Sequence, residues 1–294
     1  MVPITFVHGW DELSERDRLI AMREFAANGA RHLVLSDAMM KLMDGNYFLP
    51  RIILKQAETA GVDFVGAHAP FKDFGDLFIP EERERQQTVA RHRLHLLLAD
   101  EFGVDNCTFH IGSKYRPEYS VEQHREALFR SLDELLPLAE KLHITICLEN
   151  LRGPMNTVED LLSCMEKYRS QYLGVCFDSG HANMKENGAA YPDSAVKQTW
   201  ENAGLEVRWE KDIVERLKPY IVTCHIHDNT GIRDDHYLPG TGTVEWKRVI
   251  DALMTAPRLK CIQNEVQAWR YGLPIRTVTE NMFELFEVQP EFEK

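Results

Sequence analysis

Short apolar runs alternate with longer amphipathic segments along the whole chain. The runs are rich in β-branched and aromatic residues, which is typical of buried strands. The segments between them repeat apolar residues at three- and four-residue spacing, as in residues 81–102, 121–142 and 158–168, which is typical of helices. The eight predicted strands are Ile4–Val7, His32–Leu35, Phe64–Ala67, Asn106–Ile111, Thr145–Leu148, Gly174–Phe177, Ile221–Ile226 and Leu259–Asn264.

This alternation predicts one α/β domain over residues 1–294. Strands that alternate with helices form βαβ units and a parallel sheet. Eight such units in 294 residues fit a closed, eight-stranded (β/α)8 TIM barrel. A doubly wound open sheet is the alternative, but no G-x-G-x-x-G turn follows the first predicted strand.

Local signals agree with the predicted helix boundaries. Ser14, Ser120 and Thr157 each precede a helical pattern and are good N-caps. Residues 181–193 follow the sixth strand without periodicity, so we expect an active-site loop there. Four histidines lie in helical patterns or just after one, and we expect them on the surface: His92, His95, His124 and His143. We also expect residues 81–85, which are all charged, to form a solvated helix face.

Composition narrows the class of protein. The hydrophobic share of 44% excludes intrinsic disorder, and the net charge of −12 disfavours binding nucleic acid through bulk charge. No run approaches 18 apolar residues, and the start lacks a signal-peptide pattern, so we expect neither a membrane span nor secretion. The six cysteines form no C-x-x-C pair, which favours free buried thiols in a reducing cytoplasm over thiolate-bound zinc.

Six consecutive predicted strands, the third to the eighth, end in histidine or acidic residues. In a parallel barrel all these ends meet at one rim, where active sites lie. Carboxylates and imidazoles crowded together would repel and lose hydration, and a divalent cation resolves both problems. The strand-end residues therefore predict a metal site; they are His68, His110, Glu149, Asp178 with His181, His225 with His227, and Glu265.

Several short motifs carry these residues. They are His68-Ala69-Pro70, Phe109-His110-Ile111-Gly112-Ser113, Leu148-Glu149-Asn150, the run from Gly174 to His181, His225-x-x-Asp228, and Asp234-Asp235-His236. In these motifs the chain resembles the xylose-isomerase-like barrel superfamily, which holds sugar isomerases, ketose epimerases and abasic-site nucleases of the endonuclease IV type.

The resemblance implies a set of cation ligands. A core cation would be held by Glu149, Asp178, His225 and Glu265. His225 is preferred to His227 because the family pattern is His-x-x-Asp, whereas strand alternation places both on one face and cannot separate them. Nuclease-type members hold three zinc ions, and the positions of their further ligands are occupied here by His68, His110, His181, Asp234 and His236. We expect one manganese, zinc, cobalt or magnesium ion, with up to three left open.

The resemblance also implies chemistry. We expect an isomerase or epimerase of a sugar, sugar phosphate or sugar acid, in which Glu149 and Glu265 exchange protons across an enediolate and His181 binds a substrate oxygen. A sugar or cyclitol dehydratase or lyase is an alternative. A zinc phosphodiesterase acting on abasic DNA is another, disfavoured by the absence of Lys/Arg runs and by short early loops. A non-catalytic barrel is disfavoured by the intact ligand set.

Residues after the strand ends bear on the substrate. Basic side chains there favour a phosphate or carboxylate on a small carbohydrate, although solvated loops would show the same composition. We expect the substrate-binding residues to include Arg233, Arg152, Lys114 and Trp10. Neither a membrane nor nucleic acid is an expected partner, and a homo-oligomer is left open.

Overall fold

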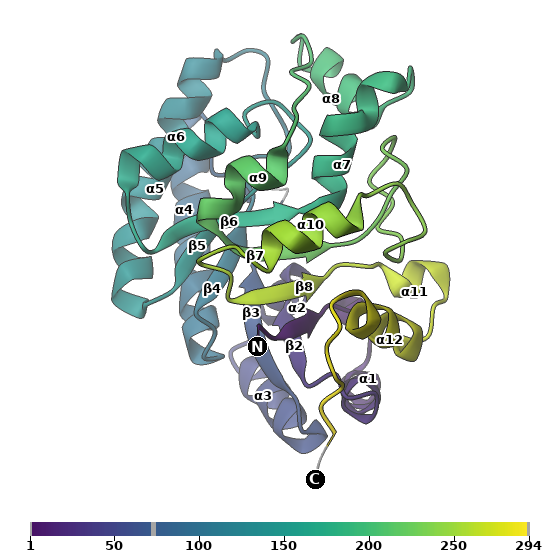
Figure 1. Ribbon diagram of the computed structural model, residues 1–294. Coiled ribbons are helices and arrows are strands. Elements are labelled where there is room, and N and C mark those ends of the chain that lie inside the picture. The colour runs from purple at the N-terminus through teal and green to yellow at the C-terminus, as the bar shows by residue number, and fades with distance from the viewer. Residues whose placement is uncertain (1, 72–74, 293–294) are drawn as a thin grey trace.

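The structure, a computed structural model, describes residues 2–71 and 75–292 and contains a closed barrel of eight parallel strands (Figure 1). The strands follow one another around the barrel in chain order, and β8 pairs with β1 to close it. In Figure 1 the yellow β8 lies beside the purple β1. The strands are β1 (Ile4–Phe6), β2 (His32–Leu35), β3 (Asp63–His68), β4 (Asn106–Phe109), β5 (Thr145–Glu149), β6 (Leu173–Asp178), β7 (Ile221–Ile226) and β8 (Cys261–Asn264). The predicted (β/α)8 TIM barrel is confirmed, and the open sheet is excluded.

Helices surround the barrel and connect successive strands (Figure 1). The α-helices are α1 (Glu15–Ala27), α2 (Asp37–Met43), α3 (Leu49–Ala60), α4 (Glu82–Glu101), α5 (Val121–Leu142), α6 (Val158–Tyr168), α7 (Ser179–Asn187), α8 (Ala195–Asn202), α9 (Ile213–Leu217), α10 (Trp246–Leu253), α11 (Ala268–Tyr271) and α12 (Ile275–Leu285). The described part of the chain also contains three short 3-10 helices: η1 (Trp10–Glu12), η2 (Gly188–Ala190) and η3 (Lys218–Tyr220).

The predicted N-caps begin their helices. The hydroxyl of Ser120 accepts the Gln123 N–H while the Gln123 side chain accepts the Ser120 N–H, a capping box that starts α5. Thr157 starts α6 in the same way, and the Ser14 hydroxyl caps α1. At the other end of α3, Gly61 adopts a left-handed conformation with φ of 70°, which glycine tolerates best. Local sequence chemistry thus sets where the helices start and stop.

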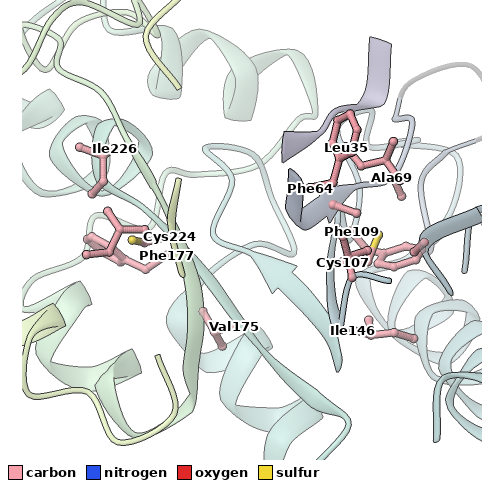
Figure 2. Close-up of a cluster of buried hydrophobic side chains, with 14 of the residues drawn as sticks. Leu35, Phe64, Ala69, Cys107, Phe109, Ile146, Val175, Phe177, Cys224 and Ile226 are labelled. Carbon is pink, nitrogen blue, oxygen red and sulfur yellow. The ribbon is translucent and has the colours of Figure 1, made fainter. Parts of the chain in front are cut away.

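Strand alternation divides the barrel side chains into two sets. Outward-facing apolar residues of the strands pack in the hydrophobic core, and Figure 2 shows part of this cluster, including Phe109, Val175 and Phe177. The alternate positions face the barrel interior, so Asp178 follows Cys176 on the inner face of β6. The inner face therefore delivers polar side chains to the carboxyl-end rim.

The predicted loop at residues 181–193 is wrong, because most of this segment is helical. Helix α7 starts where the Asp178 carboxylate accepts the backbone N–H of His181 at 2.6 Å, and η2 follows it. Residues 179–185 are all buried, so this part of the helix has no solvent face and hence no amphipathic period. The segment still belongs to the rim, since it carries His181.

Three of the four helix histidines contradict the surface prediction. His92, His95 and His124 are buried, whereas His143 is exposed. His92 donates from Nε2 to the Gly75 carbonyl at 2.8 Å, which ties α4 to the segment before it. The prediction of a solvated helix face over residues 81–85 is wrong at Arg85, which is buried.

The prediction that the cysteines are free, buried thiols is confirmed. All six are free and buried. Within residues 2–71 and 75–292, no helix is long and apolar enough to cross a membrane.

Candidate metal centre

Three adjacent strands bring the predicted core ligands together. Glu149 is the last residue of β5 and Asp178 the last of β6, and Asp178 pairs with His225 of β7. A ligand atom from each of these three residues lies within 4.8 Å of the other two. Glu265 follows β8 directly, and its Oε2 lies 3.2 Å from His225 Nδ1. The four residues thus form one cluster at the barrel rim.

The chemistry of this cluster fits a divalent cation. Glu149, Asp178 and His225 are almost completely buried. Glu149 Oε2 and His225 Nδ1 are buried without a hydrogen-bond partner, and His225 Nδ1 also lies 3.6 Å from oxygens of both Glu149 and Asp178. A buried, unpartnered carboxylate oxygen is costly unless a cation binds it. The cluster therefore suits a metal ion coordinated by oxygen and nitrogen atoms.

The shifted pKa values of Glu149 and His225 also indicate that the cluster binds positive charge. Burial raises the pKa of Glu149, but the neighbouring imidazoles of His110 and His225 outweigh it and lower that pKa well below its usual range. Burial lowers the pKa of His225, yet the surrounding anionic groups raise it well above its usual value. The cluster thus needs positive charge, supplied either by protons on imidazoles or by a bound cation. A cation that binds there would displace those protons.

The further predicted ligands surround this core. His68 and His110 place Nε2 atoms 3.4 and 3.1 Å from Glu149 Oε2. His68 donates from Nδ1 to the Ala69 carbonyl at 2.8 Å, which leaves its Nε2 lone pair free for a cation. His181 Nδ1 lies 3.2 Å from Glu149 Oε1. These three imidazoles therefore each lie close to an oxygen of the Glu149 carboxylate.

Asp234 and His236 complete the predicted set. Asp234 accepts from His181 Nε2 at 3.2 Å through Oδ2, and its Oδ1 lies 3.4 Å from His236 Nε2. The pKa of His236 is lowered by burial but raised more strongly by Asp234, to about 9. The pKa of Asp234 lies well below its usual range, because His181 and His236 outweigh the effect of its burial. The structure thus brings all nine predicted metal-ligand candidates into one region.

His227 is a further site residue that the sequence reasoning set aside. It is fully buried, and its Nε2 lies 3.1 Å from Asp178 Oδ2. Its ring stacks on that of His236, with centroids 4.0 Å apart. The signal was present in the sequence, since positions 225 and 227 share one face of β7. The family pattern favoured one histidine, but the structure places both in the cluster.

A cavity of about 420 Å³ opens beside the cluster, within the range of roughly 300–1,000 Å³ typical of small-molecule sites. Glu149, His181, Asp234 and Glu265 line it, so both predicted acid/base groups face the space. The cavity lining also includes Asp37, Phe71, Thr199, Gln267, Trp269 and Arg270.

Of the four predicted substrate-binding residues, only Arg152 lines the cavity. Its Nη1 lies 3.3 Å from Asp234 Oδ2. Lys114 and Arg233 are exposed and lie outside the cavity lining. Trp10 is a correction: it is 0% exposed in the hydrophobic core against Phe25, because the turn after β1 directs it inward. An indole does line the cavity, but it belongs to Trp269.

Fold and site together describe a (β/α)8 barrel with an acid–imidazole cluster at its carboxyl-end rim. The family model described as xylose isomerase-like TIM barrel matches residues 32–260. The chain therefore belongs to the xylose isomerase-like TIM barrel family.

Sequence relatives cover parts of the chain. An uncharacterised protein of Methanocaldococcus jannaschii, MJ1311, is 29% identical over 228 residues, 74% of this chain and 70% of that protein. The uncharacterised protein y4fM of Sinorhizobium fredii is 27% identical over 195 residues, 65% of this chain and 56% of that protein. A probable endonuclease 4 of Aquifex aeolicus is 30% identical over 122 residues, 40% of this chain and 42% of that protein.

Solved structures share the fold over nearly the whole chain. A D-tagatose 3-epimerase-like protein has a TM-score of 0.73 at 21% identity, covering 98% of this chain and 97% of that one. The 3-keto-D-glucoside 4-epimerase YcjR of E. coli has a TM-score of 0.71 at 16% identity, covering 97% and 99%. The IOLI protein with a bound zinc atom has a TM-score of 0.71 at 16% identity, covering 98% of both chains.

Proposed function

We propose that this protein is a divalent-metal-dependent sugar isomerase or epimerase that acts through an enediolate. It would remove a proton from a substrate carbon and return one to the neighbouring carbon or to the opposite face of the same carbon. The observation that carries the proposal is the position of Glu149 and Glu265. Both carboxylates belong to the metal-ligand cluster and both line the same cavity. Sugar epimerases are among the solved structures with the same fold, which supports the reaction class.

The chain supplies two acid/base groups and a histidine that can bind the substrate. Glu149 and Glu265 approach the cavity from β5 and from the end of β8, so one can remove a proton from a substrate carbon and the other can return it. His181, held between Glu149 and Asp234, is placed to bind a substrate oxygen. The bound cation would polarise the carbonyl and hydroxyl oxygens and acidify the carbon-bound proton.

The residues that would hold the cation are Glu149, Asp178, His225 and Glu265. Their oxygen-rich donor set suits manganese, cobalt or magnesium, and the imidazole also accommodates zinc. The zinc atom in the IOLI structure supports a cation in this fold. We propose one ion at this core position.

We further propose that the substrate is a small carbohydrate with a phosphate or carboxylate group, contacted by Arg152. The Arg152 side chain is 41% exposed at the cavity, where it can exchange its contact with Asp234 for one with a substrate anion. Arg152→Ala should raise KM for an anionic sugar several-fold and leave KM for a neutral sugar unchanged. Arg233→Ala is the matched control, since Arg233 is exposed outside the cavity lining. An unchanged KM for every accepted sugar in Arg152→Ala would contradict this assignment.

The test of the reaction class is a panel of aldoses, ketoses and their phosphates, incubated with protein loaded with manganese or zinc. We expect interconversion that chelation abolishes and metal restores. Glu149→Gln and Glu265→Gln should each reduce kcat by at least about 100-fold, the lower end expected for losing an acid/base group. Full activity in Glu149→Gln would refute the role of that residue.

A metal-dependent phosphodiesterase is the second candidate, favoured by one observation. All nine ligand types of the nuclease-type pattern lie in one region, and a probable endonuclease 4 is among the sequence relatives. Cleavage of a duplex with one abasic site by zinc-loaded protein, without activity on any sugar, would select this candidate. Cleavage of no abasic duplex together with activity on a sugar would eliminate it.

We also propose that the protein acts in the cytoplasm. Free thiols persist in reducing compartments, and all six cysteines are free and buried.

A further inference from the structure

The motif His225-x-x-Asp228 contains an acidic residue that the proposed site does not use. His225 belongs to the metal-ligand cluster, whereas Asp228 is fully buried and does not line the cavity. We propose that Asp228 is a positioning residue, which fixes Asp234 in the cavity wall by holding the loop that carries it. The inference rests on the proposed isomerase or epimerase function, because it assigns a residue that supports the same cavity.

The Asp228 carboxylate accepts four hydrogen bonds from N–H groups. Its Oδ1 accepts the backbone N–H of Asn229 at 2.9 Å and that of Val244 at 3.1 Å. Its Oδ2 accepts the backbone N–H of Gly240 at 2.9 Å and the indole Nε1–H of Trp246 at 2.9 Å. An ionised carboxylate has two acceptor oxygens and no donor, whereas an amide has one acceptor oxygen and cannot satisfy all four groups. The side chain therefore ties three later points of the chain to the end of β7.

The backbone of Asp228 closes the same loop. Its N–H donates to the Tyr237 carbonyl at 2.8 Å, and its carbonyl accepts the Tyr237 N–H at 2.8 Å. This antiparallel bridge closes residues 229–236 into a loop, and the carboxylate holds the chain that returns from it. The loop contains Asp234 and His236, both of which line the cavity. The position of this part of the rim thus depends on Asp228.

Two glycines let the returning chain pass close to this carboxylate. A Cβ atom at Gly242 would lie 2.3 Å from Asp228 Oδ1 and 2.3 Å from the Asn229 carbonyl oxygen, so a larger residue would push the chain away. Gly240 has a φ of 87°, a left-handed conformation that glycine adopts without strain. The chain after the loop is therefore shaped to enclose the carboxylate at close range.

Asp234 is the point at which this loop meets the groups proposed to bind the substrate. Its Oδ2 accepts from His181 Nε2 at 3.2 Å and from Arg152 Nη1 at 3.3 Å. His236 has a support of its own at the end of β8, because its Nδ1 donates to the Glu265 carbonyl at 2.9 Å. We therefore expect a loosened loop to displace Asp234 more than His236, and to remove the partner that orients His181.

Hydrogen exchange of the full-length protein tests the hold on the loop. Asp228→Asn replaces one carboxylate oxygen with an NH2 group, which leaves two of the four N–H groups without an acceptor. Exchange in residues 237–245 should become faster by at least about tenfold, whereas exchange in β4 and β5 should not change. Asp160→Asn is the matched control, because the buried Asp160 carboxylate accepts the Thr157 N–H at the start of α6 and should leave residues 237–245 unchanged. Trp246→Phe removes only one donor and should give a smaller increase in the same residues.

Turnover of the best sugar of the panel tests whether Asp228 acts through Asp234. Asp228→Asn should lower kcat by about tenfold, the lower end for losing a group that orients an active-site side chain from outside. Asp160→Asn should leave kcat unchanged, although it also removes a buried carboxylate. In the Asp234→Ala background, Asp228→Asn should lower kcat no further, because the residue that it positions is already absent. A role in stability alone would produce no such dependence on Asp234.

Two results would overturn the proposal. One is unchanged exchange in residues 237–245 of folded Asp228→Asn or, where that variant does not fold, of Trp246→Phe. The other is an unchanged kcat in Asp228→Asn, or an equal loss of kcat with and without Asp234. Both results leave the proposed isomerase intact, since the unmodified protein is still active. An unmodified protein that converts no sugar would contradict the proposed function instead, and the exchange measurement would still decide whether Asp228 holds the loop.

Discussion

Two histidines buried side by side on α4 make the fold sensitive to acid. His92 and His95 are 1% and 0% exposed, and their Nδ1 atoms lie 3.3 Å apart. Burial and then the neighbouring His95 lower the pKa of His92 to about 3. Burial and then the cations Arg91 and Lys41 lower the pKa of His95 to about 4, although Asp44 lies 3.7 Å from its Nε2.

The sign of the effect follows from these pKa values. Both histidines have a pKa of 6.5 as free groups. Below that pH they bind protons in the unfolded chain but not in the folded protein, because folding lowers their pKa values. Stability is therefore complete above pH 6.5 and falls as the pH decreases toward 4. From pH 7 to pH 5, each histidine contributes a loss of about 2 kcal/mol in the free energy of unfolding.

Urea unfolding followed by circular dichroism at pH 7, 6 and 5 measures this loss. The double variant His92→Gln/His95→Gln should lose about 4 kcal/mol less than the unmodified protein over that range, since glutamine does not titrate. The variant His143→Gln is the control, because His143 is exposed and should leave the pH dependence unchanged. Equal pH dependence in the double variant and the unmodified protein would refute the reasoning.

Further predictions concern packing, buried charge and thiols. Gly180→Ala places a methyl group against His227 and should destabilise the fold by about 1–3 kcal/mol in urea unfolding. Lys185→Met leaves the buried carboxylate of Glu210 without its partner and should cost about 3–5 kcal/mol, against at most about 1 kcal/mol for Lys197→Met in an exposed pair; equal costs would contradict this. The six buried thiols should resist a thiol reagent in the native protein and all react in urea, and rapid native labelling would contradict their burial.

Strand positions were predictable to within about two residues. The barrel strands are buried on both faces, so they appear in the sequence as short apolar runs between the longer helical patterns. The segment after β6 was not predictable by the same means. Residues 179–185 of helix α7 are all buried, so they show no amphipathic period, and the capping carboxylate of Asp178 that starts the helix belongs to the preceding strand.

The site was predictable where strand ends determine it, and not elsewhere. Glu149, Asp178 and Glu265 follow from their positions at strand ends, because parallel strands end at one rim. Trp10 and Arg233 lie in loops after strands, where the sequence does not reveal which way a side chain points. The side chain of Trp10 lies in the hydrophobic core, whereas that of Arg233 is exposed to solvent. The burial of His92 likewise depends on contacts that strand and helix periodicity does not describe.

The most direct test of the proposed function is transfer of solvent deuterium to a sugar carbon. Metal-loaded protein is incubated in D2O with the sugar of the panel that turns over best, and carbon-bound deuterium is measured by NMR. A proton exchange through Glu149 and Glu265 predicts deuterium at the epimerised or isomerised carbon, lost in Glu149→Gln and after chelation. A converted sugar without any carbon-bound deuterium, or no turnover of any sugar by metal-loaded protein, would contradict the account.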